Sequence, residues 1–414
     1  MTSRALAPAL ASVNWSTMMA ILAFVAALSA SPSRVSAFGS VRAGGLARCK
    51  PSLATLRLLS DDAGDDAAEE GISRLSTLRT LLSTHGAPGS RGCKYPDGDL
   101  VPADGDSNAE ERLNLHPHLY PIARSSKTGH YVCALRRAYA DDAEYDSSTG
   151  QPWPIVESES GGPGMRLLAL NSEHLMRRIA AEADDSGDKD GVVDIYNDGL
   201  GEGKLKDAGL DTPYEAGSVE KLGYGLEKYT LLRVGPFPDL YAAMARQHAA
   251  KGDEQSSLIA AEASNGKFTG FGSTFAFYAR LLASLPQREE EAKDAARMCL
   301  RLPIPSMGLD LHDFAEVARL AGLADEDDSE EEAMAKMQVM YEKIRDHEKE
   351  DDQAQAQMTP EQMAIDDANY LLDTTAFKGG KWADIRSKLG EIYLEGGKDE
   401  MAQYVNPSRT YTLE

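Results

Sequence analysis

A repeat with a period of about 34 residues, a length typical of helical-repeat units, runs through the second half of the chain. A shift by one period superposes LYAAMARQHAAKGD, which begins at Leu240, on TFAFYARLLASLPQ, which begins at Thr274. Alanines and one arginine then coincide at Ala242 and Ala276, Ala245 and Ala279, Arg246 and Arg280, Ala249 and Ala283, and Ala261 and Ala295. Such a period is the length of one hairpin of two antiparallel helices, and small residues let these helices approach closely. The repeat predicts stacked helical hairpins, and no strands, over residues 238–302.

A third stretch near the C-terminus has the same kind of spacing. The sequence LGEIYLEGGKDEMA resembles the consensus of tetratricopeptide (TPR) repeats. The matching residues are Leu389, Gly390, Tyr393, Gly397 and Ala402. A capping box formed by Thr359 and Gln362, with Pro360 at the first helical position, predicts where another helix begins. These signals predict a TPR-like α-solenoid or helical bundle over residues 216–414.

The region before the repeat has a different pattern. The β-favouring runs YPIARSS and HYVCALRRAY are separated by the turn signal KTG, and WPIVE and MRLLALN by SESGGPG. With the helical SEHLMRRIAAEA they predict a small α+β domain over residues 113–184. An acidic, glycine-rich linker is expected over 185–215, and an acidic, largely disordered segment with one short helix over 61–112. The expected fold class is therefore mostly α, with a small α+β domain ahead of the helices.

Residues 1–60 have the composition of a targeting sequence. They contain six basic residues and no aspartate or glutamate, and they include the apolar run MMAILAFVAALSA at 18–30. That run is too short to cross a bilayer and suits a signal peptide, with cleavage expected between Ala37 and Phe38. The basic stretch that follows is typical of a transit peptide, and the combination resembles the two-part presequence of algae with secondary plastids. Residues 1–60 predict import into the plastid stroma as a disordered presequence; the alternative is plain secretion.

The charge balance restricts the class of partner. The chain has 43 basic and 66 acidic residues, and its formal net charge is −23. Removal of the basic presequence would make it more acidic still. Such a chain repels nucleic acids and anionic lipid surfaces, so we expect a protein client and no nucleic acid. We also expect no integral membrane segment in the mature chain.

No sequence motif points to an enzyme or to a bound cofactor. The chain has no Walker loop, no Rossmann glycine pattern and no H-E-x-x-H or G-x-S-x-G motif. Its four cysteines include no C-x-x-C pair, which argues against a zinc site and a disulfide framework and fits a reducing compartment. We therefore expect no catalytic residue, no cofactor and no metal, although a site assembled from residues distant in sequence stays open.

One acidic stretch, DDSGDKDGVVDIYND at residues 184–198, resembles a calcium-binding loop. With Gly191 at the sixth position of an EF-hand loop, carboxylates fall at the third, fifth and ninth positions. These weak calcium candidates are Asp188, Asp190 and Asp194. The two strongest ligand positions hold Ser186 and Asn197 instead, neither of which supplies a carboxylate. An acidic connector is the preferred interpretation.

The repeated arginines are the candidate protein-binding residues. On the TPR template, Arg246 and Arg280 occupy the same position on the concave side, beside a floor of alanines. Two guanidinium groups there could hold a carboxylate or an extended acidic peptide. The alternative is that both are surface arginines paired with nearby acidic residues.

Several segments of the sequence are similar to segments of nuclear-encoded plastid TPR-like proteins of plants and algae. They are RVGPFPDLYAAMARQHAAKGDEQSSLIAAE, FAFYARLLASL, EEAKDAARMCLRLP and PEQMAIDDANYLLD. Over residues 113–405 the chain resembles an assembly-factor family implicated in biogenesis of the chloroplast ATP synthase. The resemblance implies a stromal assembly factor that transiently holds a subunit of a photosynthetic complex. Two alternatives remain: a plastid enzyme with a site between the two domains, and a calcium-responsive adaptor that uses residues 184–198.

Overall fold

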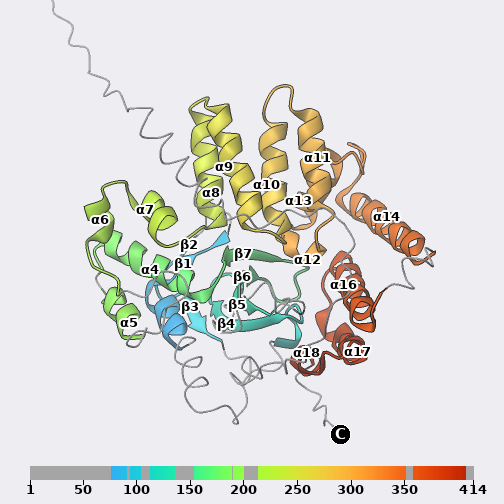
Figure 1. Cartoon of the computed structure of the whole chain (residues 1–414), viewed down its shortest axis with the longest axis horizontal. Coiled ribbons are helices and arrows are strands. Elements are labelled where there is room, and N and C mark those ends of the chain that lie inside the picture. The colour runs from blue at the N-terminus through green and yellow to red at the C-terminus, as the bar shows by residue number, and fades with distance from the viewer. Residues whose placement is uncertain are drawn as a thin grey trace, which may run out of the picture. The chain divides into compact units, whose positions relative to one another are not determined.

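The structure is a computed structural model that describes residues 76–90, 94–103, 112–136, 138, 153–188, 190–199, 213–350 and 358–406. These residues form mostly helices, with antiparallel strands on the N-terminal side (Figure 1). The predicted fold class is confirmed. The predicted presequence lies outside the described residues. No helix in the part that the structure describes is both long and apolar enough to cross a membrane.

Five antiparallel strands form one sheet in the order β3–β4–β5–β6–β7. They span Leu100–Pro102 (β3), Leu119–Ser125 (β4), Tyr131–Leu135 (β5), Ile155–Ser158 (β6) and Met165–Ala169 (β7). Strands β4 and β5 pair on either side of the turn KTG, as the hairpin signal predicts. Every residue of β5 and β6 is buried, so both faces of the sheet are covered there and these strands show no polar alternation.

The segment before the sheet contains more structure than we expected. A helix over residues 76–85 buries Leu78, Leu81 and Leu82 completely, because its apolar face joins the core beside the sheet. Strands β1 (Ala87–Pro88) and β2 (Lys94–Tyr95) then form a two-stranded sheet. The helix over 76–85 is the one short helix that we expected within 61–112, whereas the expectation of disorder is wrong for the strands that follow it.

The expected linker also contains a helix. Helix α4 (Ser172–Ser186) begins at the cap residue Asn171 and is followed by α5 (Val192–Gly199). Helix α5 packs against α4 and buries Val192 and Tyr196. The linker prediction is wrong for this part of 185–215, because a short apolar stripe is enough for a helix when a neighbouring helix covers it.

The rest of the described chain is helical. The elements are α6 (Ser218–Leu222), α7 (Leu226–Arg233), α8 (Pro238–Ala250), α9 (Glu254–Lys267), α10 (Gly272–Ala283), α11 (Glu289–Cys299), α12 (Ile304–Met307), α13 (Leu311–Leu320), α14 (Glu330–Glu350), α16 (Pro360–Phe377), α17 (Trp382–Glu395) and α18 (Asp399–Val405).

Helices α8 to α11 form two hairpins that lie side by side (Figure 1). Helix α8 begins at Pro238 and α10 at Gly272, one period of the repeat apart. The repeated alanines Ala245, Ala261 and Ala279 are completely buried where the helices touch. The prediction of helical hairpins over 238–302 is confirmed, and its physical basis is the close approach that a methyl side chain allows.

The C-terminal helices contact the sheet through buried polar groups. Helix α16 starts at the predicted capping box of Thr359 and Gln362. On α17, Trp382 Nε1 donates a 2.9 Å hydrogen bond to the carbonyl oxygen of Gly162 in the β6–β7 turn. The Tyr393 hydroxyl lies 2.7 Å from His118 Nε2. These contacts hold α17 against the sheet.

Candidate functional site

A cavity of about 300 Å³ lies where the sheet meets the first helices of the two hairpins. Its walls come from β7, from residues 88–90 at the end of β1 and just after it, from α4, α8 and α10, and from the turn between α12 and α13. That turn approaches the sheet very closely at Gly308, which has φ +57°. A Cβ atom there would lie 2.6 Å from the carbonyl oxygen of Met165. The cavity is the candidate functional site because segments from both halves of the chain converge on it.

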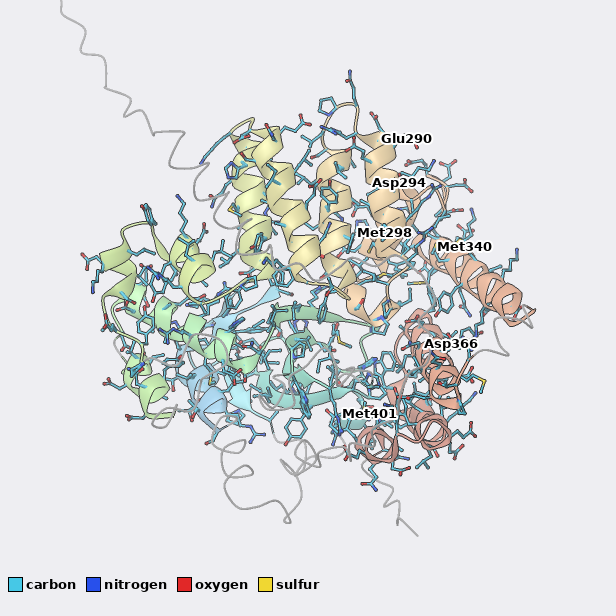
Figure 2. The ribbon with its side chains drawn as sticks, viewed as in Figure 1. Glu290, Asp294, Met298, Met340, Asp366 and Met401 are labelled. Atoms are coloured by element: carbon cyan, nitrogen blue, oxygen red, sulfur yellow. The ribbon has the colours of Figure 1, made fainter. Side chains whose placement is uncertain are left out.

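The cavity is lined by positive charge. Four arginines line it, each from a different element: Arg166 (β7), Arg178 (α4), Arg246 (α8) and Arg280 (α10). Asp239 and Asp313 are the two carboxylates in the lining, so the lining has an excess of two positive charges in a chain of net charge −23. The outward face of α11, by contrast, exposes Glu290 and Asp294 (Figure 2). Glu157, Glu182 and Glu316 lie just outside the lining and pair with Arg166, Arg178 and Arg280, so the positive charge that has no carboxylate partner among the described residues is that of Arg246.

Arg178 forms a buried bidentate ion pair with Asp239. Its two terminal nitrogens donate to the two carboxylate oxygens of Asp239 at 2.7 and 2.6 Å, and its Nε donates to Glu182 at 2.9 Å. The guanidinium also lies 4.6 Å from the ring centroid of Phe237. Burial lowers the pKa of Arg178, but the bonds to Asp239 outweigh burial and raise it. Arg178 is thus a fixed charge that ties α4 to the start of α8.

Arg280 is also paired with acidic residues of the same chain. It donates to Asp313 at 2.8 Å and to Glu316 at 2.7 Å, and both partners lie on α13. These bonds hold the second hairpin against α13. The guanidinium of Arg280 is therefore already bound by carboxylates of the same chain.

Arg246 differs from its counterpart one period later. Its guanidinium lies 5.4 Å from the ring centroid of Phe277 on α10, and its side chain is exposed. Among the described residues it has no carboxylate partner. The structure therefore brings the two predicted arginines to one cavity but gives them different surroundings.

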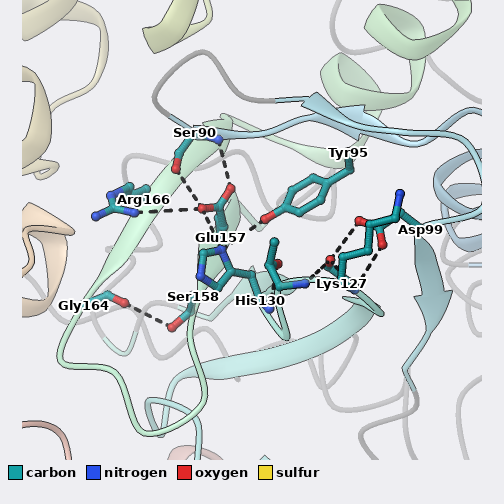
Figure 3. Close-up of polar contacts among 11 residues, drawn as sticks. Ser90, Tyr95, Asp99, Lys127, His130, Glu157, Ser158, Gly164 and Arg166 are labelled. Carbon is teal, nitrogen blue, oxygen red and sulfur yellow. Dashed lines mark hydrogen bonds and ion pairs between the residues drawn. The ribbon is translucent and has the colours of Figure 1, made fainter.

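Glu157 on β6 anchors the segment that forms one wall of the cavity (Figure 3). Its carboxylate accepts hydrogen bonds from the backbone nitrogen and the hydroxyl of Ser90, at 2.9 and 2.8 Å. Arg166, its cross-strand neighbour, lies 4.0 Å away, and His130 Nδ1 lies 3.5 Å away. Burial, followed by the nearby Glu157, raises the pKa of Tyr95. These contacts hold residues 88–90 against the sheet.

The aspartates of the calcium-like stretch have other roles or positions. Asp188 caps α5, because its two carboxylate oxygens accept from the backbone nitrogens of Val192 and Val193 at 2.7 and 3.2 Å. Asp194 lies in the first turn of α5, and Asp190 is exposed. In the part of the chain that the structure describes, no group of three or more His, Cys, Asp or Glu side chains is placed to hold a metal ion.

The polar side chains that line the cavity are arginines, aspartates, serines and one threonine. Its lining contains no histidine, cysteine or lysine among the residues that the structure describes. Cys133 and Cys299 are buried elsewhere; burial raises the pKa of both thiols, that of Cys299 to about 12. Such thiols stay protonated and unreactive at neutral pH.

Sequence reasoning missed three of the charged residues at this site: Arg166, Arg178 and Glu157. A charged residue inside a β-favouring run, such as the glutamate in WPIVES, was the available signal. Charged side chains are rarely buried unless they are paired. The identity of each partner, however, depends on the packing of distant elements.

Two family models match the helical half of the chain. The PAB middle domain matches residues 238–324, which include both hairpins, and the PAB C-terminal domain matches residues 337–410. A protein of Arabidopsis thaliana named "Protein IN CHLOROPLAST ATPASE BIOGENESIS, chloroplastic" is 30% identical over 297 residues. The matched region covers 71% of this chain and 79% of the relative. No solved structure matches the chain.

Proposed function

This chain belongs to the family of the Arabidopsis chloroplast ATPase biogenesis protein, and from that membership we propose that it is an assembly factor for the chloroplast ATP synthase. It binds a protein client transiently and does not convert a small molecule. The observation that carries the proposal is the extent of the match, which spans most of both chains. A likeness limited to one helical hairpin would support only a shared repeat.

The cavity is the place where we propose that the client is held. It lies at the bases of α8 and α10, the part of its lining that these helices supply falls within the region matched by the PAB middle domain, and both predicted arginines line it. A TPR-like array presents client-binding residues on such an inner surface. Of the two predicted protein-binding residues, Arg246 and Arg280, we propose that Arg246 contacts the client, because Arg280 is already paired with Asp313 and Glu316.

We place the protein in the plastid stroma. The relative is chloroplastic by its name, and the composition of residues 1–60 suits a signal peptide followed by a transit peptide. Import by that route would deliver the mature chain to the stroma.

The enzyme alternative has less support, although the cavity lies where that alternative expects a site. The nearest pair that resembles an acid–base pair is His130 and Glu157, and the carboxylate of Glu157 already accepts two hydrogen bonds from Ser90. A calcium-responsive role is not favoured either, because Asp188 is used as a helix cap.

Affinity purification from plastid extract tests the proposal. The tagged full chain should retain subunits of the ATP synthase, and a strain that lacks the protein should accumulate less of the assembled complex. Subunits of an unrelated complex in the eluate, together with a normal level of ATP synthase in that strain, would contradict it. The variant Arg233→Ala removes an exposed arginine of α7 and serves as the control: it should retain the same subunits as the wild type.

A further inference from the structure

We propose that the cavity binds an acidic segment of the client and that Arg246 receives one of its carboxylates. The inference rests on the proposed function, and it adds the chemistry by which the client is recognised. It also assigns different roles to the two repeated arginines: Arg246 contacts the client, whereas Arg280 is a positioning residue. Four observations support it.

The first observation is the sign of the charge. Arg166, Arg178 and Arg280 are paired with carboxylates of the same chain, so Arg246 supplies the unmatched positive charge of the lining, in a chain whose net charge is −23. A carboxylate of the client is therefore attracted to Arg246 and repelled by the acidic surface elsewhere.

The second observation is the difference between the two hairpins. Arg280 donates to Asp313 and Glu316, so its hydrogen-bonding capacity is largely used within the chain. Arg246 occupies the equivalent position one period earlier and has no carboxylate partner among the described residues. Because the equivalent arginine, Arg280, binds carboxylates of its own chain, we infer that the client supplies the carboxylate that binds Arg246.

The third observation is the orientation of Arg246. Its guanidinium lies over the ring of Phe277, at 5.4 Å from the ring centroid. Stacking on an aromatic ring holds a guanidinium in place and leaves its N–H edge available for a carboxylate. The arginine is therefore partly ordered before a client binds, which lowers the entropic cost of binding.

The fourth observation is the composition of the remaining lining. Leu167, Met307 and Leu309 contribute apolar surface beside the arginines. Helix α10 begins at Gly272, and Ser273 and Thr274 of its first turn line the cavity. That turn contains no acidic residue, so no carboxylate of the turn offsets the positive end of the helix dipole. Apolar surface beside positive charge suits a peptide, whose side-chain stems and backbone need contacts as well. A small inorganic anion would use only the charges.

A synthetic peptide measures this chemistry directly. The probe is a fluorescein-labelled peptide of alternating glutamate and alanine with blocked ends, and the readout is fluorescence anisotropy with the full chain at low salt. We expect binding that weakens as salt is added, because the charges are partly exposed. Arg246→Ala should weaken it about tenfold, which corresponds to about 1.4 kcal/mol.

Two controls make the result specific. Arg233→Ala removes an exposed arginine of α7 that does not line the cavity, and it should leave the affinity unchanged. The peptide with glutamine in place of glutamate should bind at least about tenfold more weakly than the acidic one. Because Arg246 is exposed, its variant should keep the wild-type circular dichroism spectrum and melting temperature.

Several results would overturn the inference. They are equal binding of the glutamine peptide, unchanged affinity of Arg246→Ala, and displacement of the acidic peptide by inorganic phosphate at lower concentration than by unlabelled peptide. The last result would indicate a site for small anions.

Purification from plastid extract separates this inference from the proposed function. If the wild type and Arg246→Glu both retain ATP synthase subunits, and the acidic peptide does not release them, the inference fails and the proposed function stands. If the wild type retains none of these subunits but still binds the peptide through Arg246, the proposed function fails and the chemistry of the cavity stands.

Discussion

Arg386 on α17 donates a 2.7 Å hydrogen bond to the backbone carbonyl oxygen of Leu115, 271 residues earlier in the chain. The same guanidinium donates to the carbonyl oxygens of Arg112, Leu113 and Val405. The side chain is 2% exposed, and burial lowers its pKa to about 9. A single buried cation thus satisfies backbone groups on the segment leading into β4 and at the end of α18, and so joins the C-terminal helices to the sheet.

Replacing Arg386 with alanine should destabilise the protein strongly. The substitution leaves buried carbonyl oxygens without donors, and each such group costs about 1–3 kcal/mol. We expect the free energy of unfolding to fall by roughly 3–5 kcal/mol, measured by urea denaturation. Arg386→Lys should recover only part of the loss, because an ammonium group lacks the planar fork that reaches several carbonyls. A lysine variant as stable as the wild type would contradict this account.

His118 should make the protein sensitive to acid. Burial, followed by the nearby Arg386, lowers its pKa to about 3, so the folded state keeps it neutral while the unfolded state takes up a proton near pH 6.5. Its contribution to stability is present above pH 6.5 and is lost as the pH falls toward 3. By pH 5 we expect the wild type to lose about 2 kcal/mol relative to His118→Gln, which cannot titrate there.

The measurement is the difference in unfolding free energy between the wild type and His118→Gln from pH 8 to pH 5. One part of this difference does not depend on pH, because the substitution also alters the contact with Tyr393. The other part comes from protonation of His118 and changes with pH. The diagnostic result is a gap that narrows on acidification. A gap that stays constant would show that His118 does not carry this pH dependence.

Gly380 should tolerate alanine less well than its neighbour Gly379. Both have positive φ, of +75° and +84°, so each alanine variant bears the same kind of backbone strain. A Cβ atom at Gly380 would lie 2.7 Å from the carbonyl oxygen of Gly162, whereas one at Gly379 meets nothing within 4 Å. We expect Gly379→Ala to cost about 1–2 kcal/mol and Gly380→Ala about 1–3 kcal/mol more, measured by thermal or urea unfolding. Equal losses would mean that the close approach to the β6–β7 turn is unimportant.

Two repeated alanines of α10 should differ in how well they tolerate a larger side chain. Ala279 is completely buried between helices, and Ala283, which follows it on the last turn of α10, is exposed. Ala279→Leu should destabilise the protein by about 1–3 kcal/mol, because the added atoms force the hairpins apart. Ala283→Leu serves as the matched control and should change stability by less than about 0.5 kcal/mol. The free energy of unfolding from urea titrations decides between them, and two equal effects would argue against tight packing at the repeat.

Local patterns predicted the helical half well. The period of the repeat predicted the 34-residue spacing between α8 and α10, and the capping box at Thr359 predicted the start of α16. Predictions based on composition succeeded less often. Acidic, glycine-rich stretches were expected to lack structure, yet α5 and the strands β1 to β3 formed in them because neighbouring apolar surfaces cover their few buried residues.

The sequence by itself determined the repeat, the helix caps and the hairpin of β4 and β5, because each depends on residues that lie close together along the chain. Only the tertiary structure decided that Arg178 pairs with Asp239 and that Glu157 holds Ser90. It also decided that, within the described part of the chain, Arg280 has two carboxylate partners and Arg246 has none. The reason is physical: a charged side chain takes its partner from whatever the packed elements bring within about 3 Å, and no short period in the sequence encodes that distance.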